Sequence, residues 1–223
     1  MISLKDMVKT YSLGKGSMVR AVDGVSLEVA EGEFVVITGR SGSGKTTLLN
    51  LAAGLTTPDS GGVTVDGVDL WGLSDGNRSE LRNEKIGFVF QFPSLLPSLT
   101  SLENVMLPTM FGGDHGDTAE GRAAELLGLV GLTDKLKAYP RQLSAGQQQR
   151  VVLARSLINR PRMLLADEPS SNLDEHTEEE IMELFREVHA TTAVTIMMVT
   201  HTSQLVRYGT RAIEMAGGKV IAG

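Results

Sequence analysis

The feature that most constrains this chain is a glycine-rich segment, Gly39-Arg40-Ser41-Gly42-Ser43-Gly44-Lys45-Thr46, which fits the P-loop pattern G-x-x-x-x-G-K-[ST]. It follows a nearly continuous apolar run, Glu33–Thr38, typical of a strand buried on both faces. A helical pattern runs from Lys45 to about Ala53. The glycines let backbone N–H groups converge on a phosphate, and the helix N-terminus adds positive potential. The segment therefore predicts a phosphate site built on a strand, a turn and a helix.

Individual residues of this loop have distinct expected roles. Lys45 can reach the β- and γ-phosphates of a nucleotide, and the Thr46 hydroxyl suits Mg²⁺. The alternative is a glycine-rich turn with a chance Lys-Thr pair, but the flanking strand and helix favour the P-loop. The residues expected to contact the nucleotide here are Gly39, Arg40, Ser41, Gly42, Ser43, Gly44, Lys45, Thr46 and Thr47.

Strand and helix patterns alternate along much of the chain, which favours an α/β fold with a mostly parallel sheet and helices on both faces. Between about Ser74 and Leu132, polar helix-like segments alternate with loops, one of them at Phe111–Asp117. We expect a P-loop NTPase core at about 1–90 and 160–223, an antiparallel β subdomain near the N-terminus, and an inserted helical subdomain at about 91–159. Strands are predicted at Ile2–Val8, Gly24–Val29, Gly62–Val68, Met163–Ala166 and Ala193–Val199, and helices at Gln147–Ile158 and Glu175–His189.

A second chemical pattern is the apolar strand Met163–Ala166, which ends in the carboxylates Asp167 and Glu168. Asp167 is placed to hold Mg²⁺, directly or through water, because hard cations take oxygen ligands. Glu168 is placed to orient or deprotonate an attacking water. Alone, such a strand end is more often a solvated turn. In a chain that also has a P-loop, the nucleotide interpretation becomes much stronger.

A third pattern is Leu143-Ser144-Ala145-Gly146-Gln147, followed by Gln148-Gln149-Arg150. It resembles the signature motif of ABC-type ATPases, and the resemblance extends over nearly the whole chain. Gln91 resembles the Q-loop glutamine, Ser170–Asp174 the D-loop, His201 the switch histidine, and Tyr11 the aromatic residue that stacks on adenine. Taken singly, Gln91 would be a solvated loop residue, His201 a local hydrogen-bonding residue and Tyr11 a surface or packing residue.

The resemblance implies an ATPase that binds ATP and Mg²⁺ and works as a homodimer. ATP would lie between the P-loop of one copy and Ser144, Ala145, Gly146 and Gln147 of the other, and Asp174 would link the two sites. The implied catalytic residues are Glu168 as base, with His201, Gln91 and Lys45, and the implied metal ligands are Thr46, Gln91 and Asp167. Two positions depart from the family: Ala145 replaces a glycine, and Thr202 replaces an aspartate. A requirement for positive φ at 145 would disfavour alanine.

The segments Glu84–Phe92 and Leu99–Val105 resemble the branch of lipoprotein-releasing and macrolide-exporter ATPases. This implies an integral-membrane permease as partner and a place on the cytoplasmic face of the inner membrane. Apolar residues around the Q-loop are the expected docking surface, although some of them will pack the subdomain's own core. They are Phe92, Leu95, Leu96, Met106, Met110 and Phe111.

Composition narrows the remaining alternatives. The formal net charge of −6 provides no basic field for nucleic acid, which argues against an ABC ATPase acting on DNA or ribosomes. The absence of cysteine excludes disulfides and thiolate metal sites. No apolar stretch approaches the roughly 18 residues that a membrane span needs. A cell-division type of ATPase, which signals through a permease-like partner without moving cargo, stays open as an alternative.

Overall fold

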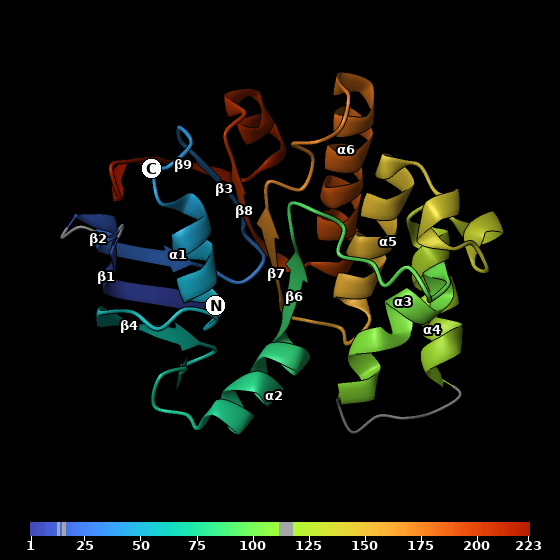
Figure 1. The fold of residues 1–223 in the computed structure, drawn as a ribbon, viewed down its shortest axis with the longest axis horizontal. Helices are drawn as coiled ribbons and strands as arrows, with labels where there is room; N and C mark the ends of the chain where they lie inside the picture. Colours follow the sequence, from blue (N-terminus) through green and yellow to red (C-terminus); the bar gives the residue numbers. More distant parts are fainter. Residues whose placement is uncertain (13, 15–16, 112–117) are drawn as a thin grey trace. The chain divides into compact units, whose positions relative to one another are not determined.

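A computed structural model describes residues 1–12, 14, 17–111 and 118–223, and the predicted loop residues 112–117 lie outside them. The chain divides into two compact units (Figure 1). The first unit comprises Met1–Ser79 and Ala193–Gly223, and the second comprises Glu80–Thr192. No helix in the described parts of the chain is both long and apolar enough to cross a membrane.

The first unit contains the antiparallel sheet expected near the N-terminus. Its strands are β1 (Ile2–Ser12), β2 (Met18–Val29), β4 (Ser60–Val65) and β5 (Val68–Asp69), in the order β2-β1-β4-β5. The predicted strand Gly62–Val68 is divided by a tight turn at Asp66 and Gly67, both with positive φ (50° and 80°), which suits a two-residue hairpin.

The same unit contains a parallel group of strands. Strand β3 (Phe34–Thr38) lies between β8 (Thr195–Thr200) and β9 (Arg211–Ala216) and is parallel to both, while β10 (Lys219–Ala222) pairs antiparallel with β9. All six residues of β8 are buried, which explains its continuous apolar pattern. Helix α1 (Lys45–Ala52) follows β3, and a 3₁₀ segment, η4 (Ser203–Tyr208), follows β8.

The second unit packs helices against a parallel pair of strands, β6 (Ile86–Val89) and β7 (Met163–Asp167). Helix α2 (Asp75–Lys85) leads into this unit. The other helices are α3 (Ser101–Met106), α4 (Thr118–Leu129), α5 (Ala145–Leu157) and α6 (Glu175–Thr192), and the 3₁₀ segments are η1 (Leu107–Phe111), η2 (Thr133–Lys135) and η3 (Pro140–Gln142). Helix α5 packs against β6, α3, α4 and α6.

One expectation for this unit was wrong in detail, because β6 lies inside the stretch 74–132 that had been assigned helices and loops. The strand has only four residues, and its second residue is Gly87. A Cβ at Gly87 would lie 2.2 Å from the Ser156 carbonyl oxygen, so glycine allows β6 to approach α5 closely. The α/β class is confirmed, with an antiparallel N-terminal sheet and mostly parallel strands elsewhere.

Candidate ATP site

The P-loop lies in the first unit and connects the buried strand β3 to α1. Gly39 and Gly44 have positive φ, 154° and 102°. A Cβ at Gly44 would lie 2.0 Å from the Ala21 carbonyl oxygen, so only glycine fits at the start of α1. No side chain caps this helix end. Helix N-termini of this kind bind anions through their backbone N–H groups.

Two polar side chains of this loop, those of Lys45 and Ser43, are buried. Lys45 is buried, and its Nζ donates to the carbonyl oxygens of Gly39 at 2.7 Å and Arg40 at 3.2 Å. Ser43 is 6% exposed, and among the described residues its Oγ has no hydrogen-bond partner. A buried hydroxyl without a partner is costly, and a phosphate oxygen would supply that partner. The Lys45 ammonium is thus held by two carbonyl groups of its own loop.

His201 is brought to the same edge of the sheet. In the parallel register Thr38 pairs with Thr200, so Gly39 and His201 are each the next residue on adjacent strands. His201 is exposed, and the Thr202 N–H donates to the Thr200 hydroxyl at 3.0 Å to shape the turn. Ligands of α/β sheets bind beyond the carboxyl ends of neighbouring parallel strands, where these residues lie.

The pairing of β1 with β2 places Tyr11 near the P-loop. Tyr11 is opposite Val19, and Ala21, two residues further along β2, abuts Gly44. At about 3.3 Å per residue, Tyr11 is roughly 7 Å along the strand from that contact. Tyr11 is 41% exposed. An exposed aromatic ring at this distance from the phosphate loop can stack on a nucleobase.

Asp167, Glu168 and Gln91 all lie in the second unit. Strands β6 and β7 are parallel with Val89 opposite Ala166, so Asp167, the last residue of β7, and Gln91, two residues after β6, lie at the same end of the pair. The Gln91 Nε2 donates to Ser171 Oγ at 3.2 Å, and Asn172 Nδ2 donates to the Gln91 carbonyl oxygen at 3.5 Å. The Q-loop glutamine is therefore tied to the D-loop.

Glu168 directly follows β7 with a φ of 45°, in the left-handed region that non-glycine residues seldom adopt. Its carbonyl oxygen accepts from the Ser171 N–H at 3.2 Å, which closes the turn into the D-loop. Backbone strain of this kind occurs most often at functional sites and lasts only where the surroundings hold the residue. The unusual backbone at 168 therefore accords with the role expected for this carboxylate.

The signature motif forms the start of α5 in the second unit. Ser144 is the N-cap: its Oγ accepts from the Gln147 N–H at 3.2 Å, and Gln147 Oε1 accepts from the Ser144 N–H at 3.0 Å. Ala145 does not have positive φ, so alanine is compatible with this position. A polar cavity of about 320 Å³ lies beside the motif and is lined in part by Arg150 and Glu180, which form an ion pair at 2.9 Å.

Asp174 caps the start of α6, a role that sequence reasoning did not foresee. Its Oδ1 accepts from the Thr177 N–H at 3.0 Å and its Oδ2 from the Thr177 hydroxyl at 2.7 Å. These hydrogen bonds hold the pKa of the Asp174 carboxyl below its ordinary value. A Cβ at Gly146 would lie 2.5 Å from Thr177 Cγ2, so the D-loop end and the signature motif meet at Thr177.

The expected site residues thus fall into two sets, each assembled within its own unit. Tyr11, the P-loop and His201 belong to the first, while Gln91, Asp167, Glu168, the signature motif and Asp174 belong to the second. Sequence reasoning missed the partners that orient these residues. Ser171 had been grouped only as part of a motif, and nothing in the sequence indicated contacts of Thr177 with Gly146.

A family model described as ABC transporter matches residues 22–171, about two thirds of the chain. This chain belongs to the ABC transporter family. Within that family it is an ATP-binding and ATP-hydrolysing subunit, as the sequence predicted.

Individual relatives of this ABC subunit match it over nearly its whole length. An uncharacterized ABC transporter ATP-binding protein of Thermotoga maritima is 48% identical over 98% of this chain and 93% of its own. The lipoprotein-releasing system ATP-binding protein LolD of Geobacter metallireducens is 43% identical over 100% and 98%. The macrolide export ATP-binding/permease protein MacB of Syntrophobacter fumaroxidans is 44% identical, but this chain covers 31% of it.

Solved ABC cassettes have the same fold. A dimeric ATP-binding cassette in a post-hydrolysis state, bound to ADP and Pi, superposes with a TM-score of 0.89 at 42% identity, covering 99% of this chain and 97% of that one. The dimeric structure of a bacterial ABC transporter cassette gives 0.90 at the same identity and coverage. These similarities confirm the predicted family and fold.

Proposed function

We propose that this chain is the ATPase of a membrane complex in the lipoprotein-releasing or macrolide-exporting branch, and that it acts on the cytoplasmic face of the inner membrane. Support for the branch comes from the names and identities of the full-length relatives. The single observation that carries the catalytic part is the pair of buried polar side chains in the P-loop, Lys45 and Ser43, on a loop that starts beside the strand end bearing His201.

In this proposal each site residue acts on one part of the bound nucleotide. Tyr11 stacks on adenine, and residues 39–47 hold the phosphates of ATP. Hydroxyl, amide and carboxylate oxygens of Thr46, Gln91 and Asp167 would hold Mg²⁺, a donor set suited to a hard cation. Glu168 orients and deprotonates water, and His201 positions the γ-phosphate.

The proposal also requires a second copy of the chain. Ser144 and Gly146 sit at the N-terminus of α5, where backbone N–H groups favour a phosphate. A second copy would bring this helix end to the γ-phosphate on the P-loop of the first, with Asp174 near both sites. Loss of the γ-phosphate on hydrolysis would release the two copies and move the attached permease.

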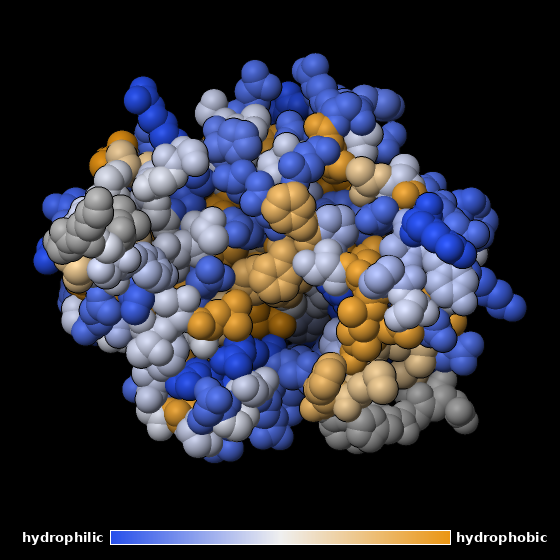
Figure 2. Space-filling view, in the orientation of Figure 1, coloured by the Kyte–Doolittle hydropathy of each residue, from blue (hydrophilic) through white to orange (hydrophobic). Residues whose placement is uncertain are grey.

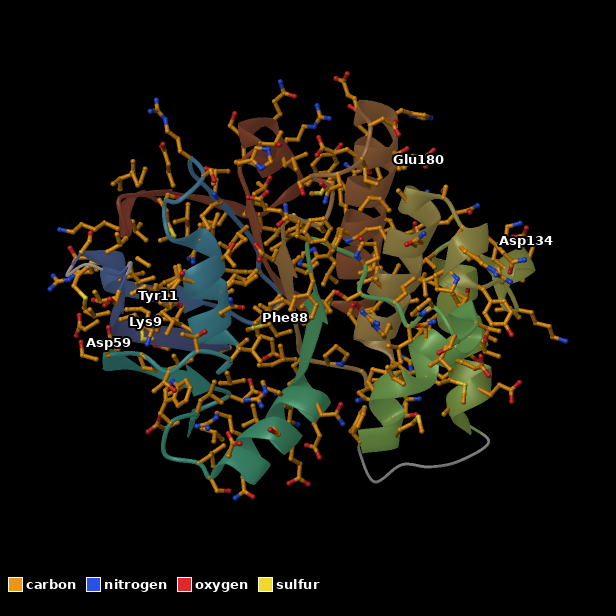
Figure 3. All side chains as sticks on the ribbon, viewed as in Figure 1. Lys9, Tyr11, Asp59, Phe88, Asp134 and Glu180 are labelled. Atoms are coloured by element: carbon orange, nitrogen blue, oxygen red, sulfur yellow. The ribbon has the colours of Figure 1, made fainter. Side chains whose placement is uncertain are left out.

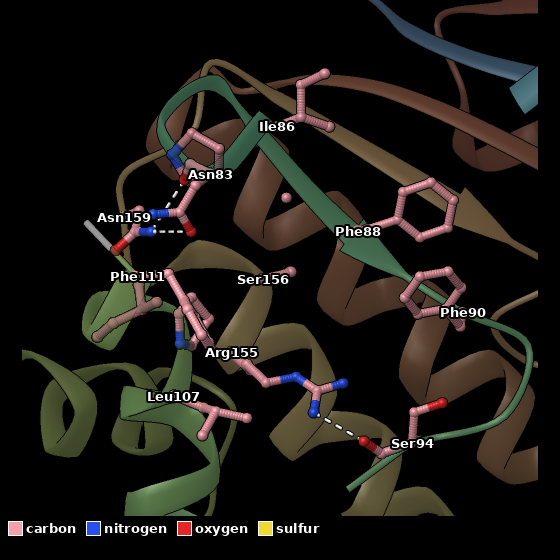
Figure 4. A pocket seen from close by; sticks show the side chains of 14 residues that line it. Asn83, Ile86, Phe88, Phe90, Ser94, Leu107, Phe111, Arg155, Ser156 and Asn159 are labelled. Carbon is pink, nitrogen blue, oxygen red and sulfur yellow. Dashed lines mark hydrogen bonds between the residues drawn. The ribbon is translucent and has the colours of Figure 1, made fainter. Parts of the chain in front are cut away.

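A cavity in the second unit is suited to receive that permease. It has a volume of about 380 Å³ and is lined by aromatic and aliphatic side chains, including Phe88, Phe90, Leu107 and Phe111 (Figure 4). Phe88 and Phe90 stack with ring centroids 4.2 Å apart, and Phe111 is 80% exposed. Apolar side chains gather over α3 in the space-filling view (Figure 2). Exposed apolar side chains grouped around a cavity mark a binding surface, and in this proposal the permease fills it.

Arg155 lines this cavity and is held in place by hydrogen bonds. Its guanidinium donates to the carbonyl oxygens of Ser94 at 3.0 Å and Pro93 at 3.2 Å, and burial lowers its pKa. Of the residues expected to form the docking surface, Phe92, Leu96, Met110 and Phe111 are exposed, while Leu95 and Met106 are half-buried. Arg155 therefore holds the segment around Pro93 and Ser94 in place, and the neighbouring apolar side chains of Phe92 and Leu96 are exposed.

Substitution of Glu168 by Gln tests the catalytic assignment. The variant should bind ATP with near wild-type affinity but hydrolyse it at least about 100-fold more slowly, because it lacks the base. It should also accumulate as an ATP-dependent dimer, measured by sedimentation. Glu187→Gln, which changes an exposed acid on α6, should hydrolyse ATP at the wild-type rate. Near wild-type turnover of Glu168→Gln would refute the role of the base.

The same variant tests the partner. Tagged Glu168→Gln, expressed in the native host and purified from gently solubilised membranes with ATP and Mg²⁺, should bring down an integral-membrane permease in stoichiometric amount. Identification by mass spectrometry would then show whether that permease belongs to the proposed branch. Recovery of only ribosomal or DNA-associated proteins would overturn the transporter assignment and leave the ATPase assignment intact.

A further inference from the structure

The end of β1 that bears Tyr11 is irregular and is held by a side chain. The β1 register with β2 shifts between Lys9 and Thr10, and the pairing of β1 with β4 reaches only as far as Val8 opposite Ser60. Asp59, the residue before β4, extends the contact with β1 beyond this point. Its N–H donates to the Val8 carbonyl oxygen at 2.8 Å, and its Oδ2 accepts from the Thr10 N–H at 2.6 Å. The carboxylate thus replaces the next hydrogen bond of the ladder.

The second oxygen of the same carboxylate fixes a lysine beside Tyr11. Lys9 Nζ lies 3.2 Å from Asp59 Oδ1 and also donates to the Thr57 carbonyl oxygen at 2.8 Å. Lys9 and Tyr11 are two residues apart on one strand, so they share a face, and Nζ lies 5.6 Å from the centre of the Tyr11 ring. Figure 3 shows Asp59, Lys9 and Tyr11 grouped on the β1–β4 side of the first unit.

We infer that Asp59 is a positioning residue for the nucleobase. Through Thr10 it fixes the backbone next to Tyr11, and through Lys9 it fixes a cation against the ring. The Tyr11 ring is thereby held ready to stack, although β1 no longer pairs with β4 there. The same contacts hold the pKa of the Asp59 carboxyl below its ordinary value. The inference rests on the proposed function, in which Tyr11 stacks on adenine.

The decisive comparison is between ATP and inorganic triphosphate, which has no base. Asp59→Asn keeps the size of the side chain and removes the charge that holds Lys9. The dissociation constant for ATP, measured by calorimetry on the purified full chain, should rise about five-fold, the loss typical of one hydrogen bond. Binding of inorganic triphosphate should not change, because the P-loop is untouched.

Two further variants complete the design. Lys9→Met keeps the apolar stem without the ammonium and should give the same selective loss of ATP affinity, even if Asp59→Asn folds poorly in a thermal melt. Asp134→Asn is the matched control. It removes an exposed carboxylate paired with Lys135 at 3.0 Å in the other unit, and it should bind both ligands as the wild type does.

A double variant separates failure of the inference from failure of the proposed function. If the carboxylate acts through the ring, Asp59→Asn should add no further loss of ATP affinity in a Tyr11→Ala background. The inference is overturned if Asp59→Asn weakens ATP and triphosphate equally, or if it weakens neither while Tyr11→Ala weakens ATP. If Tyr11→Ala itself leaves ATP affinity unchanged, the assignment of Tyr11 to adenine fails, and the inference fails with it.

Discussion

At the scale of single residues, some glycines in this chain act where two segments come into close contact. Gly87 has ordinary φ, and its importance comes from its neighbours: a Cβ there would lie 2.2 Å from the Ser156 carbonyl oxygen and 2.5 Å from Leu164 Cδ2. The carbonyl oxygen belongs to helix α5 and cannot yield as a flexible side chain could. The contact between β6 and α5 therefore depends on a missing methyl group.

Gly87→Ala should consequently lower the free energy of unfolding by about 1–3 kcal/mol, the usual cost of overpacking a core. Urea denaturation followed by circular dichroism would measure it. Gly121→Ala is the matched control, since Gly121 lies on α4 in the same unit with no atom within 4 Å of the added Cβ. This change should leave stability unchanged or raise it by at most about 1 kcal/mol. Equal losses in both variants would contradict the packing argument.

At the scale of elements, α3 shows how a helix of six residues is stabilised by its ends. Thr100 caps it in a reciprocal box: its Oγ1 accepts from the Glu103 N–H at 3.3 Å, and Glu103 Oε2 accepts from the Thr100 N–H at 2.7 Å. Asn104, fully buried, donates to the carbonyl oxygens of Leu96 and Leu99. A helix this short would not persist alone in water, so these contacts determine where it forms.

Thr100→Ala should destabilise α3 by about 1 kcal/mol, the typical cost of a lost N-cap. Hydrogen exchange of the Glu103 and Asn104 amides, read by mass spectrometry or NMR, should be faster in the variant. Thr100→Ser keeps a hydroxyl at the cap and should exchange as the wild type does. Unchanged exchange in Thr100→Ala would show that the cap contributes nothing measurable.

Some elements could be predicted from the sequence and others could not, for physical reasons. Buried strands such as β3 and β8 have unbroken apolar runs bounded by turn residues, so they were predicted within a few residues. Strand β9 has only two buried apolar residues among charged and small ones, and it was missed. The contact of Asp59 with Thr10 spans 49 positions, and no local pattern encodes such a distance.

At the scale of the whole molecule, several carboxylates are held in their charged form by nearby donors. Each has a folded pKa below its ordinary value because the donors stabilise the negative charge. Such groups stabilise the fold above the unfolded pKa, near 4, and this contribution is lost as the pH falls through the folded pKa. The carboxylates are Asp23, Asp59, Glu103, Asp134 and Asp174.

The melting temperature should therefore fall as the pH is lowered from about 5 toward 3. Differential scanning calorimetry at closely spaced pH values would measure this change. A variant with Glu103→Gln and Asp134→Asn has two fewer titrating groups and should show a shallower decline. A decline as steep as that of the wild type would show that these two carboxylates do not contribute to the loss of stability at low pH.

The tie between Gln91 and the D-loop has a mechanical consequence. Phe90 lines the 380 Å³ cavity, and the next residue is Gln91, whose side chain and carbonyl oxygen contact Ser171 and Asn172. A single peptide bond, stiff at its amide plane, separates the cavity wall from that junction. On the far side, Arg155 anchors the carbonyl groups of residues 93 and 94. We therefore expect that a guest which displaces the backbone at Phe90 also displaces Gln91 and, through its two hydrogen bonds, the D-loop residues Ser171 and Asn172.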